Sequence, residues 1–256
     1  MLARIMERRE MMKGETALDE GGISDQSAGV PQPPLANPFS GESSIPLTRD
    51  FRQVVRDIPF TELIDGRVSR RRFSDRPLTL DELAFLLWAT QGVKRVIGKS
   101  NHASLRTVPS AGARHGLETY LLVFRVEGLA PGLYHYLALE HRLEFLRPVE
   151  NAEDRITEAS CGQPFLAAAA VDFLWTAVPY RSEWRYTDQA QKYLLLDAGH
   201  VCQNLYLACE AIGCGTCAIG AYDQALMDGL VGLAGGPSCD EKDEFVVYAA
   251  PVGRPE

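Results

Sequence analysis

Residues 67–73 are the most informative stretch of the chain and read Arg67-Val68-Ser69-Arg70-Arg71-Arg72-Phe73. They gather four arginines and a serine in a protein whose formal net charge is -8. A guanidinium stays charged at any working pH and gives paired, charge-assisted hydrogen bonds to a phosphate. In an extended backbone, Arg67, Ser69 and Arg71 point to one side and Val68 and Arg70 to the other. The stretch predicts a one-sided anion site, with a solvated basic turn as the alternative.

Six further short motifs follow this stretch along the chain. In order, they are Pro77–Leu83, Arg106–Ala113, Pro131–Tyr136, Asp197–His200, Ile219–Asp223 and Pro251–Gly253. Taken together, from Leu47 to the C-terminus, the chain resembles the FMN-dependent nitroreductase superfamily, and most closely its SagB-type dehydrogenase branch. The resemblance implies FMN as cofactor, a homodimer, and a nitroreductase-like α+β fold with a mixed, mainly antiparallel sheet flanked by helices.

The resemblance also implies where the flavin is bound. The phosphate and ribityl contacts match the segment that holds Arg67, Val68, Ser69 and Arg71, and a C-terminal basic contact matches Arg254. A loop from the other subunit matches Pro109, Ser110 and Ala111, while Ile219 and Gly220 match backbone that runs along the isoalloxazine ring. Ala113 stands where many nitroreductases have an Asn, so a side-chain amide contact to the flavin is missing here.

Lys192 and Tyr193 are the catalytic candidates. In azoline-oxidising members of the branch, a Lys-Tyr pair at this place is implicated in proton removal. The chemistry is consistent, since a flavin accepts a hydride and a base must take the proton from the neighbouring atom. The alternative is a surface lysine beside a core tyrosine.

Composition excludes several classes of protein. The chain has 256 residues, 46% of them hydrophobic and 23% charged, which is ordinary for a globular protein with a substantial core. No apolar run reaches the ~18 residues of a membrane helix, and no secretory signal is recognisable. The six scattered cysteines are typical of reduced thiols in a cytoplasmic protein. The negative charge argues against nucleic acid as a partner.

The first 46 residues differ in composition from the rest. Gly, Ser, Pro, Asn, Gln and acidic residues dominate residues 14–46, so we expect a flexible tail, or a segment that lies along a partner subunit. Residues 1–13 form at most a short helix. The FMN-binding domain is then expected over residues 47–256.

Periodicity and turn residues predict most of the elements. Thr79 and Glu82 have capping-box spacing and begin a helix that Gly92 can end. Strands are expected at 117–126, 167–178 and 244–252, and a hairpin at 133–136 and 142–146 with its turn near residues 140–141. Helices are expected at 151–160, at 194–212 and from Asp223 to about 232, and short helical turns within 47–65. Residues 93–105 are predicted to be a loop, and 179–187 a lid or an interface. The long helix is predicted to be buried nearly all round or to lie at a subunit seam.

Three other patterns do not carry a function. Residues 213–218 match a dinucleotide fingerprint, but that motif must follow a strand, and this one follows a long helix. Cys214 and Cys217 have no second pair at zinc spacing, so buried thiols are the preferred interpretation over zinc or redox cycling. No histidine pair has metal-site spacing, His200 is expected in the core, and we expect no metal.

Two functions of different classes follow. One is an FMN-dependent oxidoreductase, with azoline dehydrogenation competing against NAD(P)H-dependent nitro or quinone reduction. The other is a flavin-holding scaffold subunit of a peptide-modifying complex, without turnover of its own. We expect a small-molecule or peptide substrate and no membrane partner.

Overall fold

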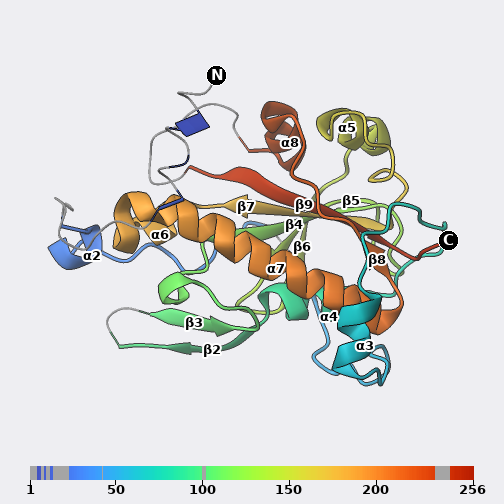
Figure 1. Ribbon diagram of the computed structural model, residues 1–256, viewed down its shortest axis with the longest axis horizontal. Helices are drawn as coiled ribbons and strands as arrows, with labels where there is room; N and C mark the ends of the chain where they lie inside the picture. The colour runs from blue at the N-terminus through green and yellow to red at the C-terminus, as the bar shows by residue number, and fades with distance from the viewer. Residues whose placement is uncertain are drawn as a thin grey trace.

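A seven-stranded sheet forms the centre of the protein in the computed structural model (Figure 1). The structure describes residues 5, 6, 9, 12, 13, 23–41, 43–99, 102–233 and 243–256. The strand order is β1-β6-β5-β4-β7-β9-β8, and neighbouring strands pair antiparallel. The strands are β1 (Ser44–Pro46), β4 (Leu117–Val123), β5 (Gly132–Leu137), β6 (Arg142–Arg147), β7 (Val171–Ala177), β8 (Gly215–Thr216) and β9 (Phe245–Gly253).

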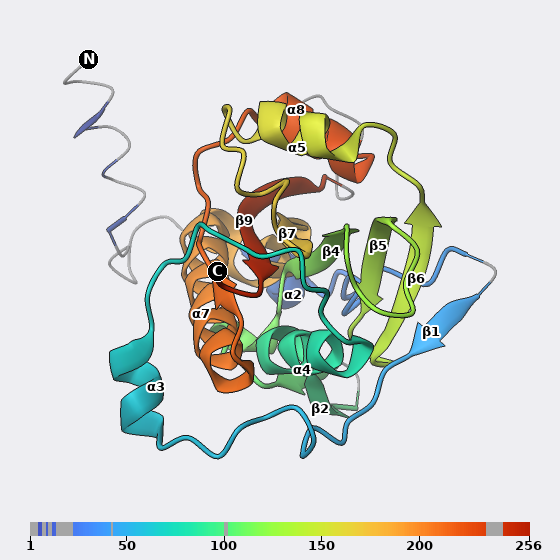
Figure 2. The ribbon, with the colours of Figure 1, turned by 90° about the vertical axis from the view of Figure 1, so that its right-hand side faces the viewer.

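Helices cover both faces of this sheet (Figure 2). They are α2 (Asp25–Ala28), α3 (Phe60–Gly66), α4 (Leu80–Gln91), α5 (Ala152–Ala159), α6 (Tyr180–Tyr186), α7 (Ala190–Ile212) and α8 (Gln224–Val231). The pair α4 and α7 packs on one face, and the pair α5 and α8 on the other. The predicted α+β class with a mainly antiparallel sheet is therefore confirmed.

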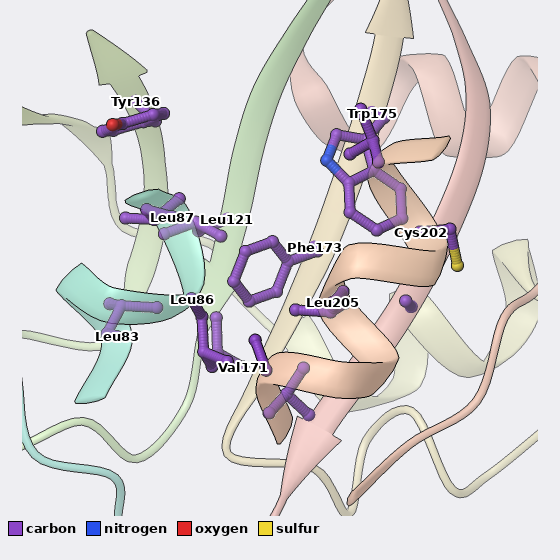
Figure 3. Close-up of a cluster of buried hydrophobic side chains, with 14 of the residues drawn as sticks. Leu83, Leu86, Leu87, Leu121, Tyr136, Val171, Phe173, Trp175, Cys202 and Leu205 are labelled. Atoms are coloured by element: carbon purple, nitrogen blue, oxygen red, sulfur yellow. The ribbon is translucent and has the colours of Figure 1, made fainter. Parts of the chain in front are cut away.

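The larger core lies between β7 and the pair α4 and α7 (Figure 3). Phe173 and Trp175 on β7 are fully buried and face Leu86 on α4 and Leu205 on α7. Burying a side chain of this size contributes roughly 1.5–3 kcal/mol, so the fully buried residues fix how α7 lies on the sheet. This matters for function because α7 carries several of the predicted site residues.

Local sequence signals explain where α4 begins and ends. The Thr79 side chain accepts a hydrogen bond from the Glu82 amide, and the Glu82 carboxylate accepts one from the Thr79 amide. Gly92 ends the helix by donating to the Trp88 carbonyl. The helix predicted after Thr79 is confirmed, as are the hairpin of β5 and β6, α5, and α8 with Asp223 as its N-cap.

Three predicted elements need correction. Residues 93–105 are not a loop, because β2 (Val93–Ile97) and β3 (Ala103–Arg106) pair as a separate hairpin rich in β-branched residues. The strand predicted from residue 167 begins only at Val171. The helix predicted from residue 194 begins at Ala190, directly after the short 3₁₀ turn Thr187–Gln189; a second 3₁₀ turn, Ala111–Ala113, lies between β3 and β4.

One face of α7 is open to solvent. Leu195 and Leu196 are 60% and 52% exposed, and Gly199 and His200 lie on the same open side. His200 is therefore not a core histidine. Of the two predictions for this helix, burial nearly all round is wrong in the single chain, and a subunit seam stays a prediction.

Residues 23–41, which we call the strap, lie against their own chain. The strap contacts α6 three times: Asp25 accepts from Tyr180, the Val30 carbonyl from Trp184, and Asn37 from Arg181. Beyond it, β1 pairs with β6. The domain boundary at residue 47 stays a prediction, and the expected helix within residues 1–13 falls largely outside the described residues.

Candidate functional site

The arginine segment, residues 67–73, lies between β8 and the C-terminus. Ser69 forms a parallel bridge with Thr216, and the Arg70 amide donates to the Thr216 carbonyl at 2.9 Å. Phe73 then bridges to Pro255. The segment thus continues the edge of the sheet, and its extended backbone begins at Arg67, directly after α3 ends (Figure 1).

Two of the predicted anion ligands meet at Tyr206 on α7. The Ser69 hydroxyl lies 2.9 Å from the Tyr206 hydroxyl. The Arg67 guanidinium carbon stands 5.2 Å from the centroid of the same ring, which is a cation–π distance. The Ser69 side remains open to solvent, so both groups can reach an anion there.

The remaining arginines of the segment diverge. Arg70 packs its stem on Gly215 and pairs with Glu210 at 3.3 Å, away from Ser69. The exposed Arg71 stands over the Phe165 ring at 5.9 Å. Val68 is 46% exposed and contributes no packing to the core. Alternation therefore separates Arg70 from Arg67 and Ser69, as predicted, but it does not bring Arg71 to Tyr206.

The glycine-rich turn after α7 is partly used by the sheet itself. The Ile219 amide donates to the Ala249 carbonyl at 2.7 Å, so in this chain that amide already has a partner. Gly220 is exposed, and a Cβ placed there would meet only Tyr248, at 3.9 Å. The open backbone at this turn is therefore at Gly220.

Arg254 is already engaged within the chain. It pairs with the Glu82 carboxylate and donates to the Ile212 carbonyl at 3.1 Å, at the carboxyl end of α7. A phosphate contact at Arg254 would have to compete with Glu82.

The loop after Pro109 is strained and fixed to α7. Positive φ angles occur at Gly112, Ala113 and His115, and for a residue with a Cβ this conformation costs energy. The Ser110 hydroxyl accepts from the His115 amide at 2.9 Å. Backbone strain of this kind is often retained at functional sites.

Asp197 on α7 holds this loop. Its buried carboxylate faces the Ser110 hydroxyl and the Ala111 amide, and its Oδ2 has no hydrogen-bond partner among the residues that the structure describes. Burial raises the pKa of Asp197, while hydrogen bonds from Ser110 and Ala111 and the nearby His200 act in the opposite direction. Pro109 is exposed beside it. Asp197 therefore anchors the part of the loop that the resemblance places against a flavin.

Lys192 and Tyr193 lie in the first turn of α7, not before it. Tyr193 packs edge-on against Tyr186 with 4.9 Å between ring centroids. Tyr186 in turn covers Gly112, where a Cβ would come within 2.4 Å of the Tyr186 hydroxyl. Lys192 and Tyr193 thus share one end of α7 with the Ser110 loop, and the aromatic segment predicted as a lid forms α6 beside them.

The predicted residues consequently form two groups on one helix. Tyr206 contacts the arginine segment, whereas Asp197 and Tyr193 lie at the end of α7 that holds the Ser110 loop. At 1.5 Å per residue, Tyr206 lies about 13 Å from Asp197 and about 20 Å from Tyr193 along the α7 axis. A single chain therefore does not bring the catalytic candidates to the arginine segment.

Sequence reasoning missed Tyr206 and Asp197 as anchors. Both lie within a helix that predicts core packing, and a single sequence does not say which loop meets a helical side chain. The only available signal was their polarity among apolar neighbours.

The buried thiols carry no site of their own. Burial raises the pKa of Cys202 and of Cys214 to about 12, which keeps both protonated and unreactive. Within the part of the chain that is described, no group of His, Cys, Asp and Glu side chains is arranged to hold a metal. Cys239 lies outside the described residues.

The donors present fit a flavin phosphate. Charged and hydroxyl groups of Arg67, Ser69 and Arg71 lie at an open surface. The neighbouring Thr216 hydroxyl is buried and has no hydrogen-bond partner in the described ranges. Gly220 leaves space for a flat ring beside Tyr248. Two hollows of about 460 and 570 Å³ lie under the strap instead, and neither is lined by the arginine segment.

Comparison with known proteins decides the family. The model of the nitroreductase family matches residues 64–254. This chain belongs to the nitroreductase family. A nitroreductase-type protein of Methanocaldococcus jannaschii is 31% identical over 201 residues, which are 78% of this chain and 93% of the relative. Nitroreductase-family proteins are flavin-type oxidoreductases, and this is the class of chemistry that the family supports for this chain.

A second relative matches over a shorter region. The trifolitoxin-processing protein TfxB of Rhizobium leguminosarum bv. trifolii is 31% identical over 112 residues, which are 42% of this chain and 30% of that protein.

Solved structures show the same nitroreductase fold. One from Anabaena variabilis has a TM-score of 0.72 and 23% identity, and the match covers 96% of this chain. It covers 45% of that longer chain, so this protein spans about half of it. The E. coli microcin synthetase McbBCD complex with truncated pro-MccB17 bound contains a chain with a TM-score of 0.59 and 17% identity, matched over 100% of this chain and 92% of that one. Among the described residues, no helix is both long and apolar enough to cross a membrane.

Proposed function

We propose that this nitroreductase-family protein is an FMN-dependent oxidoreductase of the SagB-type dehydrogenase kind. It transfers a hydride between the flavin and a small-molecule or peptide substrate, with oxidation of an azoline to an azole as the favoured reaction. The observation that carries the proposal is the open anion site at Arg67 and Ser69, fixed by Tyr206.

Different residues of the chain bind the different parts of FMN in this proposal. Arg67, Ser69 and Arg71 hold the phosphate, with Val68 beside them, and Gly220 leaves the backbone open to the ring. Pro109, Ser110, Ala111 and Ala113 belong to the second half of the site. When bound, FMN supplies a ring that accepts or gives a hydride. The Ile219 amide and Arg254 have partners within the chain, so their contribution depends on exchanging those partners.

A homodimer unites the two groups of residues. The distances along α7 keep Lys192 and Tyr193 away from the arginine segment of the same chain, and a two-fold axis across α7 would place them beside the segment of the other. Leu195 and Leu196 offer an apolar face for such an axis, and Phe60 and Ile64 on α3 are 66% and 47% exposed. Obligate interfaces typically bury ~2,000 Å² or more.

Lys192 is the proposed base for azoline oxidation, and Tyr193 positions it. Lys192 would accept the proton that an azoline loses on oxidation to the aromatic azole, and bound FMN would supply the hydride acceptor. The contact of Tyr193 with Tyr186 holds the first turn of α7, from which Lys192 extends. Removing a catalytic base typically costs ~10²–10⁴ in rate.

Two alternatives remain within the same family. NAD(P)H-dependent reduction of nitro compounds or quinones is favoured by the Methanocaldococcus relative, which is named as a nitroreductase. A flavin-holding subunit of a peptide-modifying complex is favoured by the McbBCD complex and by the toxin-processing relative. A cytoplasmic location is part of the proposal, since the buried cysteines are free thiols.

The deciding experiment follows flavin loading and anaerobic flavin reduction in the purified protein. We expect non-covalent FMN in the wild type and its loss in Arg67→Ala/Arg71→Ala, since each substitution removes a charge-assisted bond worth ~1.5–3 kcal/mol. We expect an azoline peptide to reduce the flavin slowly in Lys192→Ala and Tyr193→Phe at equal FMN loading. Full flavin occupancy in the double variant contradicts the cofactor site. Reduction by NADPH but not by azolines selects nitroreductase chemistry, and no reduction by either selects the scaffold.

A further inference from the structure

Tyr206 joins three parts of the chain that are far apart in sequence. Its hydroxyl lies 2.9 Å from the Ser69 hydroxyl and accepts from the Ala218 amide at 2.8 Å. Its ring lies under the Arg67 guanidinium at 5.2 Å. One side chain on α7 therefore contacts both the arginine segment and the turn that leads to Gly220.

The hydrogen bonds at Tyr206 favour one placement of the hydroxyl protons. A backbone amide only donates, so the Tyr206 oxygen is the acceptor for Ala218. The phenol has one proton of its own, and a partly buried proton needs a partner, which Ser69 provides. By distance alone either hydroxyl can be the donor, and the bond from Ala218 favours Tyr206 as the donor to Ser69, which leaves the Ser69 oxygen as an acceptor on its inner side.

This arrangement leaves the Ser69 proton pointing to the open side. A hydroxyl whose oxygen already accepts a bond is a stronger donor, because linked hydrogen bonds polarise one another. That proton can be donated to an anionic oxygen beside the charge of Arg67. The chain has a net charge of -8, so a fixed donor set at this position offsets an otherwise unfavourable field for an anion.

We propose that Tyr206 is a positioning residue that makes the site selective for a phosphorylated flavin. By orienting Ser69 and Arg67, it confers the preference for FMN over riboflavin, which has the same ring and no phosphate. The inference rests on the proposed FMN function and deepens it. Tyr206 touches neither the phosphate nor the ring in this account and acts through the residues it holds.

The test measures dissociation constants of FMN and of riboflavin with flavin-free protein, by quenching of flavin fluorescence. Tyr206→Phe keeps the ring that packs under Arg67 and removes only the hydroxyl, so the fold is retained. We expect about tenfold weaker FMN binding and less than about threefold change for riboflavin, since hydrogen bonds of this kind contribute ~0.5–1.5 kcal/mol each. Tyr134→Phe is the matched control, because that hydroxyl donates to the Ala130 carbonyl away from the arginine segment.

A double-mutant cycle with Ser69→Ala completes the test. If Tyr206 acts through Ser69, then Tyr206→Phe adds little to Ser69→Ala, and the two losses are not additive. Equal losses for FMN and riboflavin overturn the inference, because they place the effect at the Ala218 turn. Additive losses also overturn it. A wild type that does not prefer FMN to riboflavin contradicts the proposed function itself, and the inference with it.

Discussion

Ala113 has a backbone conformation that is unfavourable for alanine. Its φ is 53°, in the left-handed region, where a residue with a Cβ loses roughly 1–2 kcal/mol and Asn loses less. We predict that Ala113→Asn raises the thermal midpoint by about 2–4 °C, since ~1 kcal/mol corresponds to that shift in a protein of this size. Calorimetry of flavin-free protein checks it.

The control for this prediction is Ala111→Asn in the same loop. Ala111 has no positive φ, so its substitution should bring no stabilisation. Equal effects at both positions would mean that the gain does not come from backbone strain.

Asp172 is a buried carboxyl near the start of β7, and within the described part of the chain neither of its oxygens has a hydrogen-bond partner. Complete burial raises the pKa of Asp172 well above its usual value. The folded protein therefore keeps the proton at a pH where the unfolded chain releases it. Stability from this group is complete below a pH of about 4 and is lost as the pH rises toward the raised pKa.

We predict that Asp172→Asn removes this loss. Urea unfolding of flavin-free protein between about pH 5 and pH 8 should show the variant gaining on the wild type with rising pH, by up to ~1.4 kcal/mol per unit. Parallel pH profiles would show that Asp172 ionises in the folded protein.

At the scale of elements, the sequence best predicts the helices and strands whose position a single local signal determines. The capping box of Thr79 and Glu82 defined α4, and alternation with a turn defined the hairpin of β5 and β6. Asn204 on α7 makes a contact that local sequence patterns do not predict. Its side chain donates to the Ala89 carbonyl of α4, which is distant in sequence. These elements followed from local patterns and the fold class from the resemblance, whereas the anchors of the site depend on which loops meet α7.

The strap depends on such long-range contacts. Asn37 donates to Glu244 at 2.9 Å, accepts from Arg181 at 2.6 Å, and its amide donates to Glu118 at 2.6 Å. Burial alone would raise the pKa of Glu118, but Arg181 and His135 lower it to about 2, so the carboxylate stays charged inside the protein. A polar composition therefore does not make this segment independent of the domain.

We predict that Asn37→Ala lowers the free energy of unfolding by roughly 1–3 kcal/mol, since it leaves buried charged groups short of partners. Gln32→Ala is the control, because its hydrogen bonds to His102 are exposed, and it should cost less than ~0.5 kcal/mol. Urea titration distinguishes the two, and equal small effects would show that the strap adds nothing to stability.

At the scale of the whole molecule, the two residue groups on α7 predict complementation between defective chains. One copy carries Arg67→Ala/Arg71→Ala, and the other carries Gly112→Val, whose side chain would collide with Tyr186. In a two-fold dimer, each mixed pair contains one site with both halves intact. Co-expression should restore FMN to about a quarter of the sites, whereas each variant alone should bind little.

Flavin absorbance per chain measures this recovery. No recovery in the mixed sample, with heterodimers verified by mass, would show that each chain builds its site alone.

The three residues of β1 have a consequence for solubility. They cover the outer edge of β6, and Pro46 ends the pairing with a residue that has no amide to offer a further strand. A chain trimmed to residue 47 would present the backbone donors and acceptors of β6 to its neighbours. Such an edge is a template for strand addition between molecules, so β1 protects the protein from polymerising along its own sheet.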